Sequence, residues 1–468
     1  MTVARVRRRP PVGPPRPWAF PEAESTVAPN GLRILLVDLP GQHVLSLRLA
    51  LPAPVADETP GTEGSTLLMA RCLDEGTTTH SATELAEVAE RHGIALGAGA
   101  GEQGVHLGLE VTARHLPAAV ELLLECLTGP TFPAPEVSRL VRHRLTDLAH
   151  ELADPTGCAG HEFRTAYFDP QGRAHLPLGG SPSTVGTLTS DVLADRHAGL
   201  SPVGGTLVLA GDLSDVPDAA GLLSSTFGSW RSTAVPAAVG RASRRAPDAE
   251  RLVLVPRPGA AQTELMLGRP GPDRRTEHGW GTYQALGMLF GGAPHARLDR
   301  VLREERGYTY GMRLGFRPRR QGGQCMVGGS VRADATLPAL EETLRILAVP
   351  GAELTGREVR EAADYLAMTA PSRYLTADTV ADELVSLLHD GLEPAVVTQT
   401  LTDLAALTVE RAAGAWDAVR TGPGWTVVVV GDPVALEGVA RSGLADVQVA
   451  GGPPPLIPEP ALRRRTAW

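Results

Sequence analysis

Short apolar runs near the start of the chain predict β-strands. Residues 34–37 and 44–51 are rich in aliphatic side chains, and Pro40-Gly41-Gln42 between them is typical of a turn. In residues 105–111 every second position is apolar, which is typical of a strand with one buried face. These positions predict three strands, the first two joined by that turn.

Helical spacing predicts helices between and after these strands. Residues 83–91 carry apolar side chains at helical intervals, and Gly93 is suited to end that helix. Residues 116–127 form a strongly apolar helix that begins just after the alternating strand ends. The predicted order is a strand pair, a helix, a strand, long helices and a further strand.

The same order of landmarks occurs twice along the chain. Pro40-Gly41 recurs as Pro258-Gly259, an offset of 218, and the run from Leu207 to Asp212 recurs as Val427 to Asp432, an offset of 220. Three further pairs recur in the same order at offsets of 221, 222 and 219: Leu116-Pro117-Ala118 with Leu337-Pro338-Ala339, Glu136-Val137 with Glu358-Val359, and Leu188-Thr189 with Leu407-Thr408. A nearly constant offset indicates an internal duplication.

We therefore predict an α+β protein made of two homologous mixed α/β domains. The first domain is expected at residues 28–230 and the second at 251–450, joined by a polar linker at 231–250. Residues 1–27, rich in arginine and proline, and residues 451–468, rich in proline, are expected to be irregular tails.

Composition and charge narrow the classes of function. The net charge of −9 argues against nucleic acid as a partner, because phosphate binding needs a basic face. No apolar run approaches the roughly 18 residues that span a bilayer, and the first residues lack the apolar segment of a signal peptide. The four cysteines form no Cys-x-x-Cys pair, so neither a disulfide framework nor a cysteine zinc site is expected. We expect a cytoplasmic protein with no membrane contact.

Two glycine landmarks in the first half resemble the insulinase/pitrilysin family of zinc peptidases, which includes the mitochondrial processing peptidases. In that family a Gly-x-x-His-x-x-Glu-His motif is followed a few residues later by Gly-Thr. Here Gly64 matches the first glycine of the motif, and Gly76-Thr77 matches the later Gly-Thr. The resemblance covers nearly the whole chain, from about residue 28 to 449. It implies that the zinc histidines would fall at Leu67 and Arg71 and the general base at Ala70.

None of these three side chains suits its family role. Leucine and alanine offer no lone pair for zinc, and arginine stays cationic and repels the ion. The third family ligand, a glutamate, would fall near Thr146 or Asp147. We therefore expect that this chain binds no zinc and that a homologous partner subunit carries it.

The second half retains a different family feature. The run from Leu302 to Tyr310 resembles a family stretch whose arginine and tyrosine, seven residues apart, reach into the active site of the partner domain. The matching pair is Arg303 and Tyr310. Their guanidinium and phenol groups can orient a substrate carbonyl and stabilise an oxyanion. The alternative is that Arg303 is an ordinary surface arginine and Tyr310 a residue packed in a strand.

Other candidate groups have plain structural alternatives. His143, Asp147, His150 and Glu151 would share one helix face, which suits either a metal or a solvated surface. His161-Glu162 and His175 are isolated, and we expect them to be structural. Gly99-x-Gly101-x-x-Gly104 matches a bare nucleotide-loop pattern without a surrounding βαβ unit, so a mobile loop is expected.

The resemblance implies a non-catalytic, substrate-positioning subunit of a heterodimeric zinc endopeptidase. Arg303 and Tyr310 would act in trans on the partner's zinc site, with an extended peptide as substrate, and leader or precursor removal is one suitable setting. Three alternatives stay open: a purely structural homologue, a peptide-binding protein without a catalytic partner, and an enzyme with a new site in the old chamber.

Overall fold

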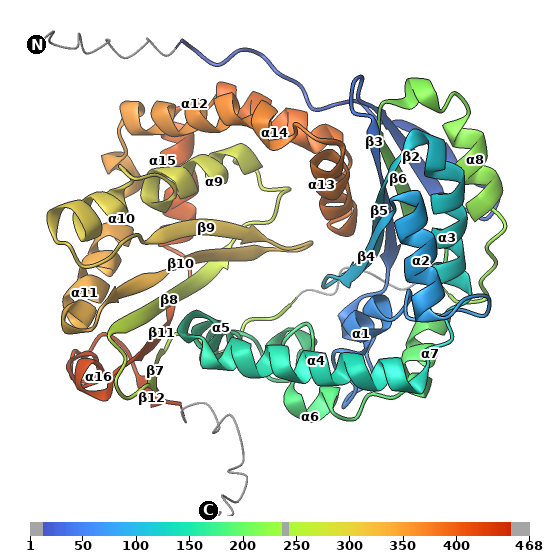
Figure 1. The fold of residues 1–468 in the computed structure, drawn as a ribbon. Coiled ribbons are helices and arrows are strands. Elements are labelled where there is room, and N and C mark those ends of the chain that lie inside the picture. The colour runs from blue at the N-terminus through green and yellow to red at the C-terminus, as the bar shows by residue number, and fades with distance from the viewer. Residues whose placement is uncertain (1–12, 236–242, 451–468) are drawn as a thin grey trace, which may run out of the picture.

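The structure, a computed structural model, describes residues 13–235 and 243–450. Two six-stranded sheets, each covered by helices, face each other across the middle of the molecule (Figure 1). Both helices and strands contribute heavily, and the predicted α+β class is confirmed.

The first sheet has the strand order β1-β2-β6-β3-β5-β4. In this sheet β2 runs parallel to β6, and along the order β6, β3, β5, β4 each strand is antiparallel to its neighbour. The strands are β1 (Glu24–Val27), β2 (Arg33–Asp38), β3 (Val44–Pro52), β4 (Ala95–Ala100), β5 (Gly104–Thr112) and β6 (Thr206–Gly211). The predicted strands thus form, but β6 lies between β2 and β3, so the Pro-Gly-Gln turn joins strands that do not pair.

The second sheet has the order β12-β7-β11-β8-β10-β9, which matches the first at five of its six places. Its strands are β7 (Leu252–Pro256), β8 (Gln262–Gly271), β9 (Arg313–Pro318), β10 (Gly323–Arg332), β11 (Thr426–Gly431) and β12 (Val447–Val449). β4 and β9 are the outer strands at equivalent edges. The outer strand at the other edge differs, since β1 is antiparallel to β2 whereas β12 is parallel to β7.

Strand register confirms the internal duplication. Leu47 pairs with Leu209 and with Leu109, and Leu265, 218 residues later, pairs with residues 429 and 329, each 220 residues later. The turns repeat as well. The Gly41 amide donates to the Asp212 carboxylate at 2.8 Å, and the Gly259 amide donates to Asp432 at the same distance.

Helices cover the outer face of each sheet. On the first sheet they are α1 (Ser65–Arg71), α2 (Ala82–His92), α3 (Leu116–Thr128) and α8 (Ala219–Phe227), around a leucine- and valine-rich core. On the second they are α9 (Trp280–Gly287), α11 (Thr336–Leu347) and α16 (Pro433–Ala440), and α12 (Gly356–Arg373) and α15 (Val409–Arg420) pack on α9. The helix predicted at 83–91 ends as expected at Gly93, which has φ of 62°.

The inner faces are covered by helices exchanged between the halves. α5 (Pro155–Tyr167) comes from the first half and packs on β7, β8 and β11 of the second sheet. α13 (Ala377–His389) comes from the second half and packs on β3 and β6 of the first sheet. The two helices begin 222 residues apart and are equivalent in the duplication. Each half therefore completes the other half's core.

The remaining helices link these layers. They are α4 (Ala134–Ala153), α6 (Pro182–Val185), α7 (Ser190–Ala198), α10 (Arg297–Asp299) and α14 (Ala395–Ala405), with π-helical segments at Met288–Gly292 (η5) and Arg300–Glu305 (η6). No helix in the part of the chain that the structure describes is long and apolar enough to cross a bilayer.

Two predicted irregular segments are ordered in part. Within the predicted tail 1–27, β1 pairs with β2, the Phe20 side chain is buried, and Trp18 stacks on Tyr374 at 5.7 Å between ring centroids. These aromatic side chains find apolar partners although prolines surround them. In the predicted linker 231–250, Ala246 and Ala249 are buried. Residues 1–12, 236–242 and the predicted tail 451–468 lie outside the described residues.

The glycine-rich stretch predicted as a mobile loop is instead edge strand β4. Ala95 to Ala100 pair with β5, and only residues 101–103 form the turn between the two strands. Glycine is used here because of close approach, since a Cβ on Gly99 would lie 2.7 Å from the His106 ring. The nucleotide-loop pattern therefore has no phosphate-binding context.

Candidate functional site

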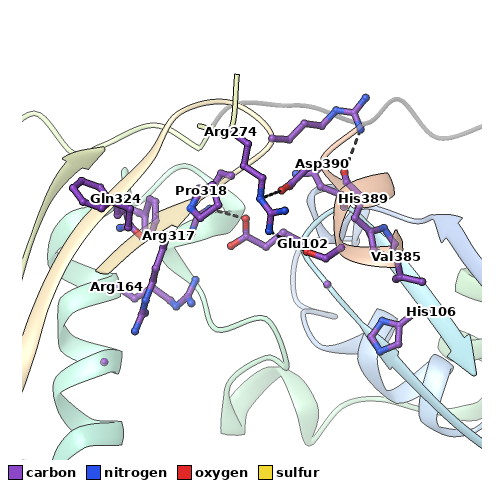
Figure 2. Close-up of a pocket in the computed structure, with 18 of the residues that line it drawn as sticks. Glu102, His106, Arg164, Arg274, Arg317, Pro318, Gln324, Val385, His389 and Asp390 are labelled. Carbon is purple, nitrogen blue, oxygen red and sulfur yellow. Dashed lines mark hydrogen bonds and ion pairs between the residues drawn. The ribbon is translucent and has the colours of Figure 1, made fainter. Parts of the chain in front are cut away.

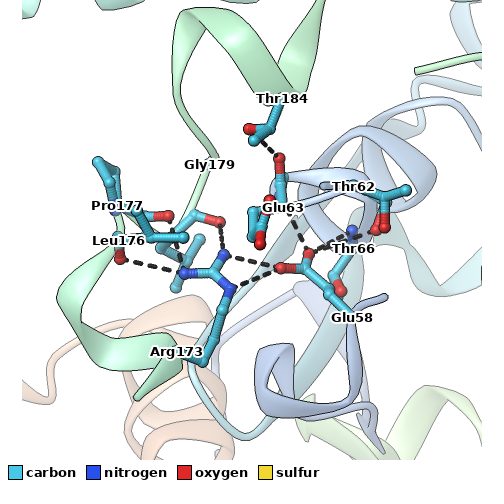
Figure 3. A network of polar contacts seen from close by, with 12 residues as sticks. Glu58, Thr62, Glu63, Thr66, Arg173, Leu176, Pro177, Gly179 and Thr184 are labelled. Carbon is cyan, nitrogen blue, oxygen red and sulfur yellow. Dashed lines mark hydrogen bonds and ion pairs between the residues drawn. The ribbon is translucent and has the colours of Figure 1, made fainter. Parts of the chain in front are cut away.

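Helix α1 carries the positions where the family's zinc motif would lie, and a buried ion pair holds its beginning in place. Glu58 accepts hydrogen bonds from the amides of Gly64 and Thr66, at 3.2 and 2.9 Å (Figure 3). Its other oxygen pairs with the Arg173 guanidinium at 2.7 Å, and the Glu58 side chain is fully buried. The carboxylate satisfies amide groups that the glycine N-cap cannot satisfy, and its charge favours a helix N-terminus.

The loop at 178–180 closes over the start of α1. Gly64 has φ of 98°, and a Cβ there would lie 2.8 Å from the Gly179 carbonyl oxygen. A Cβ on Gly179 would in turn lie 2.8 Å from the Leu67 side chain and within 2.8 Å of the Arg144 guanidinium. The glycine landmark that matches the family motif is therefore required by close packing.

The three degenerate zinc-site positions are filled by packing and by arginine. Leu67 is 8% exposed and Ala70 is fully buried, so both belong to the core around α1. Arg71 points outward, and its guanidinium lies 3.8 Å from the Asp147 carboxylate on α4. Asp147 thus lies opposite Arg71, near the place where the third ligand was expected.

The donor set at this place does not fit a zinc ion. The cavity of about 300 Å³ between α1 and α4 has two possible ligands in its lining, His143 and Asp147. Its lining also includes Arg71 and the largely buried Arg144, which pairs with Glu151 at 2.7 Å. Two guanidinium groups repel a divalent cation, and leucine and alanine cannot ligate one. The described residues contain no group of three or more His, Cys, Asp or Glu side chains arranged for a metal.

The helix-face cluster on α4 is a surface whose carboxylates pair with arginine. His143 and His150 are exposed, while Asp147 and Glu151 pair with Arg71 and Arg144. The structure therefore matches the solvated-face alternative. His161 and Glu162 on α5 are half-buried, and burial lowers the pKa of His161 and raises that of Glu162.

Arg303 and Tyr310 lie on a separate surface, beside the beginning of β9. Arg303 belongs to η6, where its guanidinium lies 3.3 Å from the neighbouring Glu304 carboxylate, and the Arg303 side chain is 42% exposed. Tyr310 is 87% exposed, so it is not packed in a strand as the structural alternative supposed. Among the described residues, no hydrogen bond or ion pair joins this pair to α1.

The backbone around Tyr310 is well anchored although its side chain is free. The Thr309 hydroxyl donates to the Ser330 carbonyl at 2.6 Å and accepts from the Gly311 amide at 3.0 Å. On the other side, the Met312 amide donates to the fully buried Asp299 carboxylate at 2.7 Å. An exposed tyrosine on a fixed backbone is suited to contact a second molecule.

A larger cavity, of about 760 Å³, lies between the two halves, and sequence reasoning did not identify it (Figure 2). Its walls come from the β4–β5 turn, α5, the β9–β10 hairpin and α13. Arg164, Arg317 and Gln324 lie on one side of it, and His106 and His389 on the opposite side. These residues come from segments far apart in the chain, so no local motif signals them.

Charge in this cavity is unevenly paired. Arg319 pairs with Glu102 at 2.7 Å, and Arg274 contacts Asp390 at 3.5 Å. Burial lowers the pKa of His106, and it lowers the pKa of His389 to about 4, so both rings are neutral near pH 7. The fixed charges of the cavity near pH 7 are therefore those of its arginines and carboxylates.

Comparison with known proteins places the chain in a family. Residues 33–155 match the family described as Insulinase (Peptidase family M16), and residues 191–366 match the one described as Peptidase M16 inactive domain. The two matches together cover more than half of the chain. The chain therefore belongs to the M16, or insulinase, family, as its landmarks indicated.

Relatives in sequence are bacterial. A Mycobacterium tuberculosis protein described as an uncharacterized zinc protease is 28% identical over 300 residues, 64% of this chain and 67% of that protein. One from Streptomyces coelicolor with the same description is 26% identical over 292 residues, 61% of this chain and 62% of that protein.

Solved structures confirm the fold. A peptidase M16 inactive domain from Pseudomonas fluorescens superimposes with a TM-score of 0.80 at 22% identity, covering 88% of this chain and 98% of that one. A protease from Helicobacter pylori gives a TM-score of 0.79 at 16% identity, covering 88% of this chain and 100% of that one. At such identity the likeness shows the two-domain fold alone.

Proposed function

We propose that this chain is the non-catalytic, substrate-positioning subunit of a heterodimeric zinc endopeptidase. A homologous partner subunit with an intact His-x-x-Glu-His motif supplies the zinc and the general base. This chain supplies Arg303 and Tyr310, which reach the partner's active site when the two subunits close around a peptide.

The observation that carries the proposal is that the Tyr310 side chain is exposed while its backbone is held by hydrogen bonds. A tyrosine that is 87% exposed exposes apolar surface to water, while the hydrogen bonds of Thr309 and Met312 fix its backbone. That combination favours a contact that is completed by another molecule. Arg303, in the preceding helical segment, also lacks a buried partner and is free to bind a carbonyl or carboxylate.

The side chains on α1 support the proposal that the partner subunit, and not this chain, supplies the metal site. Its family positions hold Leu67, Ala70 and Arg71, and a metal-activated water needs ligands and a base that these side chains cannot provide. Arginine and tyrosine donors can still hydrogen-bond a substrate carbonyl oxygen in a partner's active site and stabilise the negative charge that develops on it. The chain keeps groups that assist hydrolysis and lacks those that start it.

The test combines this chain with its candidate zinc-motif partner and measures peptide cleavage and bound zinc for each alone and for the mixture. We expect activity in the mixture only, with zinc following the partner. Arg303→Ala and Tyr310→Phe should each lower kcat about 100-fold, because a lost oxyanion donor removes a few kcal/mol of transition-state stabilisation.

Matched controls separate the proposed contact from general surface effects. Arg306→Ala changes an exposed arginine just after the same helical segment, and Tyr365→Phe changes an exposed tyrosine on α12. Both should leave kcat unchanged. A partner that is fully active alone would favour the alternative of a catalytically dead structural or peptide-binding homologue, and zinc-dependent hydrolysis by this chain alone would contradict the proposal.

A further inference from the structure

Two arginines on one wall of the cavity between the halves have no carboxylate partner, and a third cavity arginine, Arg320, donates to the His389 carbonyl at 3.2 Å. The side chain of Arg317, on β9, makes no hydrogen bond or ion pair with any described residue. Arg164, on α5, donates to the Ala174 carbonyl at 3.1 Å and lies 6.0 Å from the Phe168 ring centre, but pairs with no acid. Both line the same wall of the cavity (Figure 2).

The carboxylates nearby are already engaged. Glu102 pairs with Arg319 at 2.7 Å, and Asp382 pairs with Arg48 at 2.7 Å. Asp390 faces Arg274 at 3.5 Å. The lining has five arginines and three carboxylates, an excess of two positive charges, in a chain whose net charge is −9. This positive charge is therefore a local feature of the cavity wall.

The electrostatic environment of Arg164 shows the same shortage of anions. Burial lowers the pKa of its guanidinium, and Arg319, Arg173 and Arg317 lower it further against a single opposing contribution from Glu102. Holding such a group among other cations costs free energy that an anionic ligand would offset. Gln324, in the same wall, is 5% exposed, and its side-chain nitrogen also lacks a hydrogen-bond partner in the described chain.

We propose that this wall, centred on Arg164 and Arg317, binds the carboxylates of an acidic peptide segment. Guanidinium groups bind carboxylates through paired hydrogen bonds, and a cavity of about 760 Å³ has room for several side chains. Phe163, Phe316 and Met266 also line the cavity and provide apolar surface for the rest of a peptide. This inference deepens the proposed function by naming its substrate class, and it rests on that function for the identification of the ligand as a peptide.

The experiment is calorimetric titration of the full chain, without a partner, with a short acetylated and amidated peptide rich in glutamate. We expect binding that weakens with salt, and at least about tenfold weaker binding of the isosteric glutamine peptide. The glutamine peptide with a free C-terminal carboxylate distinguishes a terminal from a side-chain carboxylate. Recovery of affinity by that peptide would assign the wall to a peptide C-terminus.

Variants locate the binding. Arg317→Gln and Arg164→Gln should each weaken the glutamate peptide about tenfold, and Arg317 is exposed, so its variant is expected to fold normally. Arg114→Gln, at an exposed position away from the cavity, makes the same change in net charge and should have no effect. Equal losses in all three variants would reduce the effect to diffuse attraction and overturn the proposal.

Two further outcomes would also overturn it. Equal binding of the glutamate and glutamine peptides would mean that carboxylates are not recognised. Tighter binding of inorganic phosphate than of the glutamate peptide would mean that the wall selects another anion. Because no partner and no cleavage enter this measurement, its failure leaves the proposed subunit role untouched, and failure of that role leaves the binding result standing.

Discussion

At the scale of single residues, the loop before α1 shows that similar backbone angles can have different causes. Gly61 and Gly64 both have positive φ, 90° and 98°. A Cβ on Gly61 would meet nothing within 4 Å, whereas one on Gly64 would meet the 178–180 loop at 2.8 Å. The first glycine provides a turn, and the second also provides space.

We expect Gly64→Ala to lower the free energy of unfolding by about 1–3 kcal/mol more than Gly61→Ala. Both variants share backbone strain of about 1 kcal/mol, and only the first also forces two segments apart. Chemical denaturation of the two variants measures the difference. Equal losses would show that the loop relaxes without cost.

The buried pair of Glu58 and Arg173 supports a second prediction. Glu58→Gln leaves the Arg173 cation in the interior without its counter-charge, although carbonyl oxygens of residues 176–178 still accept its hydrogen bonds. We expect a loss of about 3 kcal/mol in the free energy of unfolding. Glu361→Gln, which breaks an exposed pair with Arg357 on α12, should cost no more than about 0.5 kcal/mol. Comparable losses in both would contradict the argument.

At the scale of elements, the sequence predicted the repeat and many of its strands and helices, but not the exchange of α5 and α13. Recurring landmarks at an offset near 220 were sufficient to find two equivalent units, because equivalent strands keep equivalent turns. An amphipathic pattern shows that a helix has one buried face. It does not show which of the two sheets that face packs against. The glycine-rich β4 was missed for a related reason, since its partner strand compensates for low strand propensity.

The candidate site was likewise predicted where it depends on local sequence and missed where it depends on tertiary structure. The family spacing predicted candidate positions on α1 and the pair Arg303 and Tyr310, and the structure adds what each of these side chains contacts. The cavity residues Arg164, Arg317 and His389 were missed because they converge from three separate elements. Only tertiary structure brings such residues together, so periodicity and spacing carry no signal for them.

The exchange of helices supports a prediction about coupling between the halves. Leu384 on α13 is fully buried against the first sheet, in the cluster that contains Leu35 and Val208. Leu384→Ala should cost about 2–5 kcal/mol and raise hydrogen exchange in β6, which belongs to the other half of the chain. Leu375→Ala, at a position 69% exposed, is the matched control. Increased exchange confined to the second half would contradict this coupling.

At the scale of the whole molecule, the seam between the halves combines apolar packing with ion pairs. Arg319 with Glu102, Arg33 with Glu393, and Arg48 with Asp382 each join one half to the other. The cavity lies along this seam, and its walls come from both halves. Any change of charge at the seam therefore acts on stability and on the cavity together.

We expect acid to lower the free energy of unfolding through His389, which lies between α13 and β5 where the two halves meet. Burial, together with a smaller contribution from His106, whose ring centre is 6.4 Å away, lowers its pKa from the usual 6.5 to about 4. Asp390 and Asp382 line the same cavity, and Arg320 donates to the His389 carbonyl. The folded chain thus keeps the ring neutral at a pH where the unfolded chain protonates it.

The sign of the effect follows from this difference. Stability from the neutral ring is fully present above about pH 6.5 and is lost as the pH falls toward about 4, where the folded ring also protonates. We expect the free energy of unfolding to fall by up to about 3 kcal/mol across that window from this group. In His389→Gln the fall in the free energy of unfolding between pH 7 and pH 4 should be smaller by about that amount. His295→Gln, at an exposed position, should show the same fall as the wild type. Denaturation midpoints measured from pH 7 to pH 4 decide it, because an unchanged slope in His389→Gln would assign the acid sensitivity to other groups.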